Sequence, residues 1–168
     1  MLTSGINFLN FKEKKNNPIV KKKLNLILKE KTQVIESLTE NYKNNFNQKK
    51  IHKFKKSKNY RIIGMGGSSL GTHAIYDFLK HKIKKKFNFI DNLQVKQNNK
   101  SKKKNFFTNL VVSKSGNTIE TILNANIFIK KKDKNIFITE NKKSYLFLLA
   151  QKLKAEIIHH NNFIGGRY

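Results

Sequence analysis

The chain has 168 residues, of which 38% are hydrophobic, so it suits about one domain with a single core. It has no cysteine, which excludes a disulfide framework and a thiolate zinc site. It also has no apolar run near the ~20 residues that a membrane span needs. We therefore expect a cytoplasmic protein that does not bind membranes. The net charge of +26 is carried almost wholly by Lys, which favours a solvated, compositionally biased surface over specific nucleic-acid readout.

Residues 1–58 are interpreted as a basic segment with helical content. Pro18 suits the first turn of a helix, and apolar residues recur at helical spacing over residues 19–42, with a break expected near Thr32. Residues 43–58 are rich in Lys and Asn. We expect a mobile connection there.

Residues 59–168 alternate short apolar runs with segments of helical spacing. Strands are expected at residues 60–65, 87–90, 106–112, 135–139 and 155–159, and helices at residues 68–83, 118–129 and 144–153. The first of these helices is expected to carry an apolar face of Leu70, Ala74, Ile75, Phe78 and Leu79. This alternation indicates an α/β fold whose mainly parallel sheet is covered on both faces.

The expected fold is a doubly wound, five-stranded sheet of the flavodoxin-like order 2-1-3-4-5. In that order the chain reverses direction between the first and third strands, and ligands bind outside the carboxyl ends of the strands at that point. Two turns rich in Gly and hydroxyl side chains follow these two strands. Sequence chemistry and topology therefore predict a site at the same place.

The first turn, GMGGSSLG at residues 64–71, has the chemistry of a phosphate-binding loop. Its early glycines allow positive φ and the close approach of a ligand. Ser68 and Ser69 are expected to cap the following helix, whose N-terminus favours an anion. The spacing fits neither a Walker A loop nor the dinucleotide fingerprint. An ordinary strand–helix turn with a serine cap is the alternative.

The second turn, SKSGNTIET at residues 113–121, gathers short polar side chains around a single glycine. Their hydroxyl and amide groups can donate hydrogen bonds to phosphate oxygens. Asn117 and Glu120 also resemble a capping box, with Asn in place of the usual Ser or Thr. Capping does not explain Ser113 and Ser115, which precede the helix.

These turns and the segment GGRY at residues 165–168 resemble three motifs of the glucose-6-phosphate isomerase family, in the family's order and near its spacing. The first resembles Gly-x-Gly-Gly-Ser-x-Leu-Gly, and the second resembles Ser-Lys-[Ser/Thr]-x-x-Thr-x-Glu-Thr. The third resembles Gly-Gly-Arg-[Tyr/Phe]-Ser. The resemblance covers about residues 60–168, and the first 58 residues are compatible with the family's N-terminal helical region.

The resemblance implies a sugar-isomerase (SIS) domain over residues 59–168 and interconversion of glucose 6-phosphate and fructose 6-phosphate through an enediol. It implies substrate-phosphate binding by Gly67, Ser68, Ser113, Lys114 (mainly through its backbone), Ser115 and Thr118. Arg167 would stabilise the enediolate, and Glu120 would have an orienting role. The family needs no cofactor or metal. Its full-length members are expected to bind hexose 6-phosphate as homodimers.

The family's general base, its ring-opening histidine and a late lysine lie beyond Tyr168, so we expect an N-terminal fragment without the catalytic base. Two other classes stay open. A non-catalytic sugar-phosphate-binding SIS module would share the second turn but not the other two motifs. A basic nucleic-acid-binding protein would need aromatic rings on a basic face, whereas most Phe residues here fall where burial is expected. His73 is expected to be exposed, and no His/Asp/Glu cluster has metal-ligand spacing.

Overall fold

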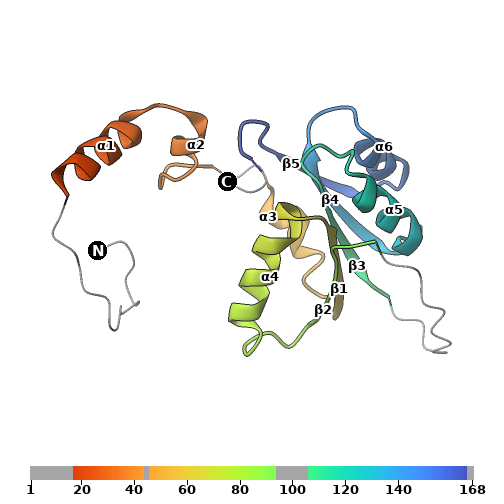
Figure 1. Cartoon of the computed structure of the whole chain (residues 1–168). Coiled ribbons are helices and arrows are strands. Elements are labelled where there is room, and N and C mark those ends of the chain that lie inside the picture. The colour runs from red at the N-terminus through yellow and green to blue at the C-terminus, as the bar shows by residue number, and fades with distance from the viewer. Residues whose placement is uncertain (1–16, 44–45, 94–105, 166–168) are drawn as a thin grey trace. The chain divides into compact units, whose positions relative to one another are not determined.

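The computed structural model describes residues 17–43, 46–93 and 106–165 (Figure 1). The chain divides into two compact units, Met1–Tyr42 and Lys43–Tyr168. None of the described helices has the length and apolarity that a membrane span requires.

The first unit contains two helices, α1 (Pro18–Lys29) and α2 (Gln33–Glu36). The side chain of Asn17 caps α1 by accepting a hydrogen bond from Ile19 N at 3.0 Å. Thr32 caps α2 in the same way, through Ile35 N at 3.3 Å. The break expected near Thr32 is therefore confirmed, because its hydroxyl caps the start of a separate helix.

The second unit contains one parallel sheet and its helices. In chain order the elements are α3 (Gln48–His52), β1 (Asn59–Gly64), α4 (Gly67–Leu79), β2 (Lys86–Ile90), β3 (Thr108–Val112), α5 (Ile119–Phe128), β4 (Lys134–Glu140), α6 (Tyr145–Lys152) and β5 (Glu156–His160). The sheet order is β2-β1-β3-β4-β5, and every pairing is parallel. The expected doubly wound α/β fold is confirmed.

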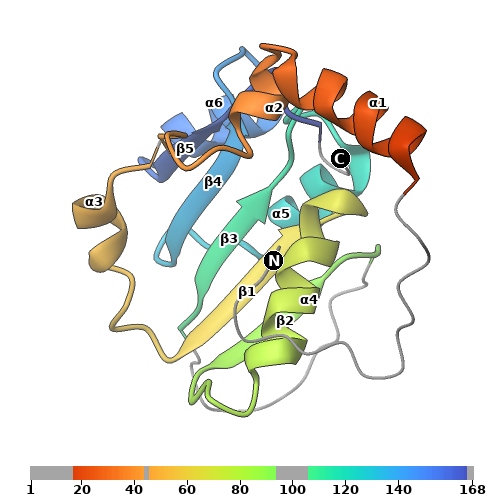
Figure 2. The ribbon, with the colours of Figure 1, turned by 90° about the vertical axis from the view of Figure 1, so that its left-hand side faces the viewer.

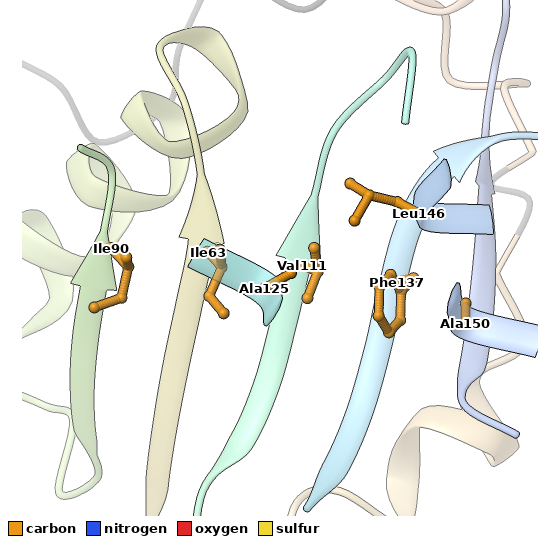
Figure 3. Packing of buried hydrophobic residues seen from close by; sticks show 7 residues of the cluster. All are labelled: Ile63, Ile90, Val111, Ala125, Phe137, Leu146 and Ala150. Carbon is orange, nitrogen blue, oxygen red and sulfur yellow. The ribbon is translucent and has the colours of Figure 1, made fainter. Parts of the chain in front are cut away.

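Helices lie on both faces of the sheet. Figure 2 shows α4 in front of β1 and β2, with α5 and α6 behind the sheet. The core on the α5–α6 side consists of Ile63, Ile90, Val111, Ala125, Phe137, Leu146 and Ala150 (Figure 3). These side chains come from four neighbouring strands and two helices, so their burial fixes the register of the sheet.

Helix α4 corrects two predictions. Most of the apolar face expected from the sequence is exposed, and Phe78 is 78% exposed. The face that contacts β2 instead carries His73 and Tyr76, whose rings lie 3.7 Å and 5.6 Å from the ring of Phe89. His73, expected to be exposed, is half-buried against this ring. Aromatic side chains on β2 select the helix face that packs, which helical spacing alone does not show.

Residues 46–58 also differ from the expected mobile connection. They form α3 and a following turn in which Phe54 is buried at 6% exposure. The hydroxyl of Tyr60 donates a hydrogen bond to Phe54 O at 2.6 Å, and Lys53 Nζ lies 2.9 Å from Glu156 Oε2 on β5. Lys50 Nζ lies 3.6 Å from Glu156 Oε1, so one buried ring and two ion pairs fix this Lys-rich segment to the sheet.

Candidate functional site

The two turns predicted to bind phosphate lie beside each other at the carboxyl edge of the sheet. Gly64 ends β1 and is the register partner of Val112, which ends β3. A Cβ atom on Gly64 would lie 3.1 Å from Val112 O and 3.3 Å from Ser68 Cβ. Glycine at this position therefore allows the backbone of the first turn to lie close against the end of β3.

The first turn bends at Gly66, which has φ 54° and ψ −124° and stands at the N-cap of α4. Ser69 N and Leu70 N both donate to Gly66 O at 3.0 Å, and Ser69 Oγ donates to the same oxygen at 3.2 Å. Ser68 Oγ makes no hydrogen bond within the described part of the chain. The expected serine cap is therefore wrong, and Ser68 keeps a free hydroxyl in the first turn of α4.

The second turn is organised around Ser113, which is 2% exposed. Its hydroxyl lies 3.1 Å from Thr118 Oγ1 and accepts a hydrogen bond from Gly116 N at 3.2 Å. Ser115 is exposed, and its Oγ accepts a hydrogen bond from Asn117 N at 3.3 Å. The turn thus folds through its own hydroxyls, with Ser113 inside and Ser115 at the surface.

The capping box expected of Asn117 and Glu120 is also wrong. Helix α5 has Thr118 at its N-cap and no side-chain capping bond. Asn117 Oδ1 instead accepts a hydrogen bond from Tyr145 N, at 3.0 Å, at the start of α6. Glu120 is half-buried, and its carboxylate makes no hydrogen bond or ion pair within the described residues. The backbone amides in the first turn of α5 therefore receive no hydrogen bond from a capping side chain.

The start of α6 and the end of β4 hold the second turn in place. Leu146 N donates to Gly116 O at 3.0 Å, and Glu140 N donates to Lys114 O at 3.0 Å. Gly116 has φ +67°, and a Cβ atom there would overlap Ser144 Oγ and lie 2.9 Å from Thr139 Oγ1. This packing was not predicted, because Thr139 and Ser144 show their role only once β4 lies beside β3.

The two helices that start at this edge differ from the other described helices in how their N-termini are capped. Asn17, Thr32, Asn47 and Ser144 cap α1, α2, α3 and α6 through their side chains. Helices α4 and α5, the two that follow the Gly/Ser turns, have no side-chain cap. Their first-turn amides carry a partial positive charge, and both helices start at adjacent strand ends.

One ion pair lies beside the backbone of the second turn. Lys114 Nζ lies 3.6 Å from Glu140 Oε1, and Lys114 is half-buried. The ammonium is thereby directed toward the end of β4, which leaves the amide of Lys114 as its contribution to the turn. Within the described residues, no group of three His, Cys, Asp or Glu side chains could hold a metal ion.

The whole chain, and not only its two Gly/Ser turns, was compared with known protein families. The family model for phosphoglucose isomerase matches residues 5–168. The chain belongs to the phosphoglucose isomerase family. The predicted family relationship is confirmed.

Two bacterial glucose-6-phosphate isomerases are similar to this member of the family. The enzyme of Borreliella afzelii (strain PKo) is 33% identical over 131 residues, and that of Borrelia garinii subsp. bavariensis is 31% identical over 130 residues. In both cases the match covers 68% of this chain and 24% of the relative. The chain therefore spans about a quarter of the length of these relatives.

Solved structures share the fold. A hypothetical protein of Thermus thermophilus superposes with a TM-score of 0.54 at 22% identity, covering 66% of this chain and 29% of that protein. The Vibrio vulnificus NanR protein complexed with ManNAc-6P gives 0.52 at 20% identity, covering 70% and 43%. Tagatose-6-phosphate ketose/aldose isomerase from Escherichia coli gives 0.50 at 20% identity, covering 67% and 32%. At 20–22% identity, these likenesses show the fold alone.

The structure brings most of the predicted site residues of this phosphoglucose isomerase family member to one edge. Gly67 and Ser68 lie in the first turn of α4, and Ser113, Lys114, Ser115 and Thr118 form the adjacent turn. Glu120 lies in the first turn of α5. Arg167 lies outside the described residues.

Proposed function

We propose that this chain provides the phosphate-binding part of a glucose-6-phosphate isomerase site. The observation that carries the proposal is the pair of adjacent turns whose helices lack side-chain caps. A hexose 6-phosphate held there would place its phosphate against amides of both α4 and α5, where donors and helix dipoles favour a dianion.

We call the proposed phosphate site the cradle; its residues are Gly67, Ser68, Ser113, Lys114, Ser115 and Thr118. Ser115 and Thr118 donate their hydroxyls to phosphate oxygens, and Lys114 donates its amide. Ser113 fixes the shape of the turn, because its buried hydroxyl bonds Gly116 N and Thr118 Oγ1. Gly67 and Ser68 contact the sugar phosphate from the first turn, where the lack of a Cβ on Gly67 permits close approach.

The isomerisation step is assigned to a longer protein that contains this fold. The reaction needs ring opening and then a positioned base that moves a proton between adjacent carbons. We propose that Arg167 stabilises the enediolate, that Glu120 orients a histidine, and that this chain by itself lacks the base. A homodimer and a cytoplasmic location belong to the same proposal. In the longer enzyme, Arg167→Ala should lower kcat more than it changes KM, because its partner charge develops in the transition state.

Calorimetric titration with fructose 6-phosphate tests the cradle directly. Ser115→Ala and Thr118→Ala should each weaken binding by about 1–3 kcal/mol, because each leaves a phosphate oxygen without its donor. Thr39→Ala is the matched control, since its hydroxyl bonds only the local Glu36 O at 2.8 Å. Unchanged binding in both site variants, with circular dichroism showing intact folds, would contradict the proposal.

A non-catalytic sugar-phosphate module is the second candidate, because the same architecture occurs in NanR complexed with ManNAc-6P. An isomerisation assay on a protein extended to the length of its longer relatives distinguishes the enzyme from the non-catalytic module. Turnover by the extended protein but not by this chain supports the enzyme. Turnover by this chain alone would contradict the assignment of the base to another part of the enzyme.

A further inference from the structure

A hollow lies at the opposite edge of the sheet from the two turns. It has a volume of about 420 Å³ and is lined by residues at the amino ends of β1, β3 and β4. Its lining consists of residues 56–59, 106–108 and 132–134. The volume falls within the ~300–1,000 Å³ that small-molecule sites occupy.

The charge of this hollow is strongly positive. Four lysines line it, Lys56, Lys58, Lys132 and Lys134, against the single carboxylate of Asp133. That carboxylate already has partners within the fold, because Asp133 Oδ2 accepts hydrogen bonds from Asn109 Nδ2 at 3.1 Å and from Lys130 N at 3.2 Å. The lining thus has a net positive charge with no carboxylate that lacks partners, and a bound polyanion would offset that charge.

An exposed aromatic ring forms part of the same lining. Phe106 is 67% exposed, and its carbonyl accepts a hydrogen bond from Asn59 Nδ2 at 3.5 Å. The neighbouring Phe107 is engaged differently, because its ring lies 4.1 Å from the guanidinium of Arg61. Phe106 thus keeps a free face beside the lysines, where a planar heterocycle could stack.

Hydroxyl groups complete the polar part of the hollow. Ser57 Oγ and Thr108 Oγ1 lie 2.6 Å apart and share one hydrogen bond, which links the segment before β1 to the start of β3. Both oxygens keep acceptor capacity. Thr108 is only 1% exposed, so the half-buried Ser57 is the hydroxyl that a ligand could reach. The lining therefore offers cations, a ring face and an acceptor within one small volume.

We infer that this hollow binds a nucleotide, that is, an aromatic base whose ribose carries two or three phosphates. The lysines would contact the phosphates as point charges, and Phe106 would stack on the base. A single exposed ring in a hollow of about 420 Å³ accommodates one base, whereas single-stranded nucleic acid is held by successive stacked rings along a groove. The site is independent of the sugar-phosphate cradle, which lies at the other end of the strands.

Calorimetry at about 150 mM salt, without divalent cations, tests the inference with ATP and with tripolyphosphate. At that ionic strength the Debye length is about 8 Å, so diffuse attraction to the basic surface is screened. We expect one ATP per chain. The double variant Lys132→Gln/Lys134→Gln should weaken both ligands at least about tenfold. Phe106→Ala should weaken ATP about fivefold or more and leave tripolyphosphate unchanged, because stacking involves only the base.

The matched control is Lys82→Gln/Lys84→Gln, which removes the same charge from exposed positions outside the hollow. It should change neither affinity by more than about twofold. Equal weakening by the two double variants, several ATP molecules per chain, or no heat with ATP would overturn the inference. Displacement of ATP by an octathymidylate that binds more than tenfold tighter would assign the hollow to nucleic acid and also overturn it. Fructose 6-phosphate should not displace ATP, since it is proposed to bind at the other edge.

Discussion

Replacing Gly116 by alanine tests whether the second turn is held by the segment that follows β4. Gly116 has φ +67°, and an added Cβ would overlap Ser144 Oγ while lying 2.8 Å from Ser144 Cβ and 2.9 Å from Thr139 Oγ1. Rotation of the Ser144 hydroxyl can remove the first contact but not the second. The new methyl group therefore forces the turn and the start of α6 apart.

The cost has two parts that can be worked from this geometry. A left-handed conformation costs a non-glycine residue about 1–2 kcal/mol. Forcing an extra carbon into a packed site costs about 1–3 kcal/mol more. Gly116→Ala should therefore lower the free energy of unfolding by about 2–5 kcal/mol.

Urea unfolding followed by far-ultraviolet circular dichroism measures this loss. Gly71→Ala is the matched control, because a Cβ at Gly71 meets nothing within 4 Å and the residue lies inside α4. Since alanine favours a helix interior over glycine, that variant should be more stable than the wild type by about 0.5–1 kcal/mol.

A double-mutant cycle with Ser144→Gly separates crowding from backbone strain. Ser144 caps α6 through Phe147 N at 3.4 Å, and replacing such a cap by glycine costs only a few tenths of a kcal/mol. The second substitution removes both Ser144 atoms in the path of the new methyl, so it should restore about 1 kcal/mol or more in the Gly116→Ala background. Additive effects, or wild-type stability for Gly116→Ala, would refute the packing described here.

Three further substitutions test other parts of the second unit. Burial raises the pKa of Glu156, but the hydrogen bond and charge of Lys53 and the charge of Lys50 outweigh it, so its pKa is lowered. Lys53→Met should therefore destabilise the protein at neutral pH. Its difference in unfolding free energy from the wild type should shrink as the pH falls below about 4.3, where Glu156 of the unfolded chain becomes protonated, and should vanish as the pH passes below the folded-state pKa. Arg61→Met should cost about 2–4 kcal/mol in urea unfolding, because it leaves Asn109 Oδ1 and a backbone carbonyl without their donor at 3.0–3.1 Å; a loss below about 1 kcal/mol would mean that water replaces it. Phe78→Ser should change the stability of this chain by less than about 0.5 kcal/mol, and a larger loss would contradict the exposure of that ring.

The sheet order and the position of the two turns could be predicted because they depend on local chemistry and on chirality. Continuous apolar runs define the strands, and right-handed crossovers leave few ways to arrange them. Once β1 and β3 are neighbours, Gly64 and Ser113 must lie at the same edge. Ser113 could be recognised from its place after an apolar strand and before a glycine.

The packing partners of each helix could not be predicted in the same way. Apolar spacing on α4 selects the face of Phe78, yet the rings of β2 contact the face of His73. The capping pattern of Asn117 fits its own helix equally well, and only the tertiary fold shows that it binds Tyr145 N instead. Both errors concern choices between two locally acceptable arrangements, and contacts far apart in the sequence make the choice.

The side-chain caps give a physical reason for the phosphate site that we propose at this edge. A helix end that is neither capped nor solvated leaves donors without partners, so caps are favoured wherever no ligand is needed. In this structure Asn117, which stands beside α5, caps α6, and Ser69 bonds the backbone of its own turn. The first-turn amides of α5 are thereby left to water or to an anion. In α4 the amides of Ser68, Ser69 and Leu70 donate to Met65 O and Gly66 O, so Gly67 N is the first-turn amide without a bond within the described residues. A phosphate that bonds these free amides would act as a shared cap for both helices, so its binding free energy would add to the stability of the fold.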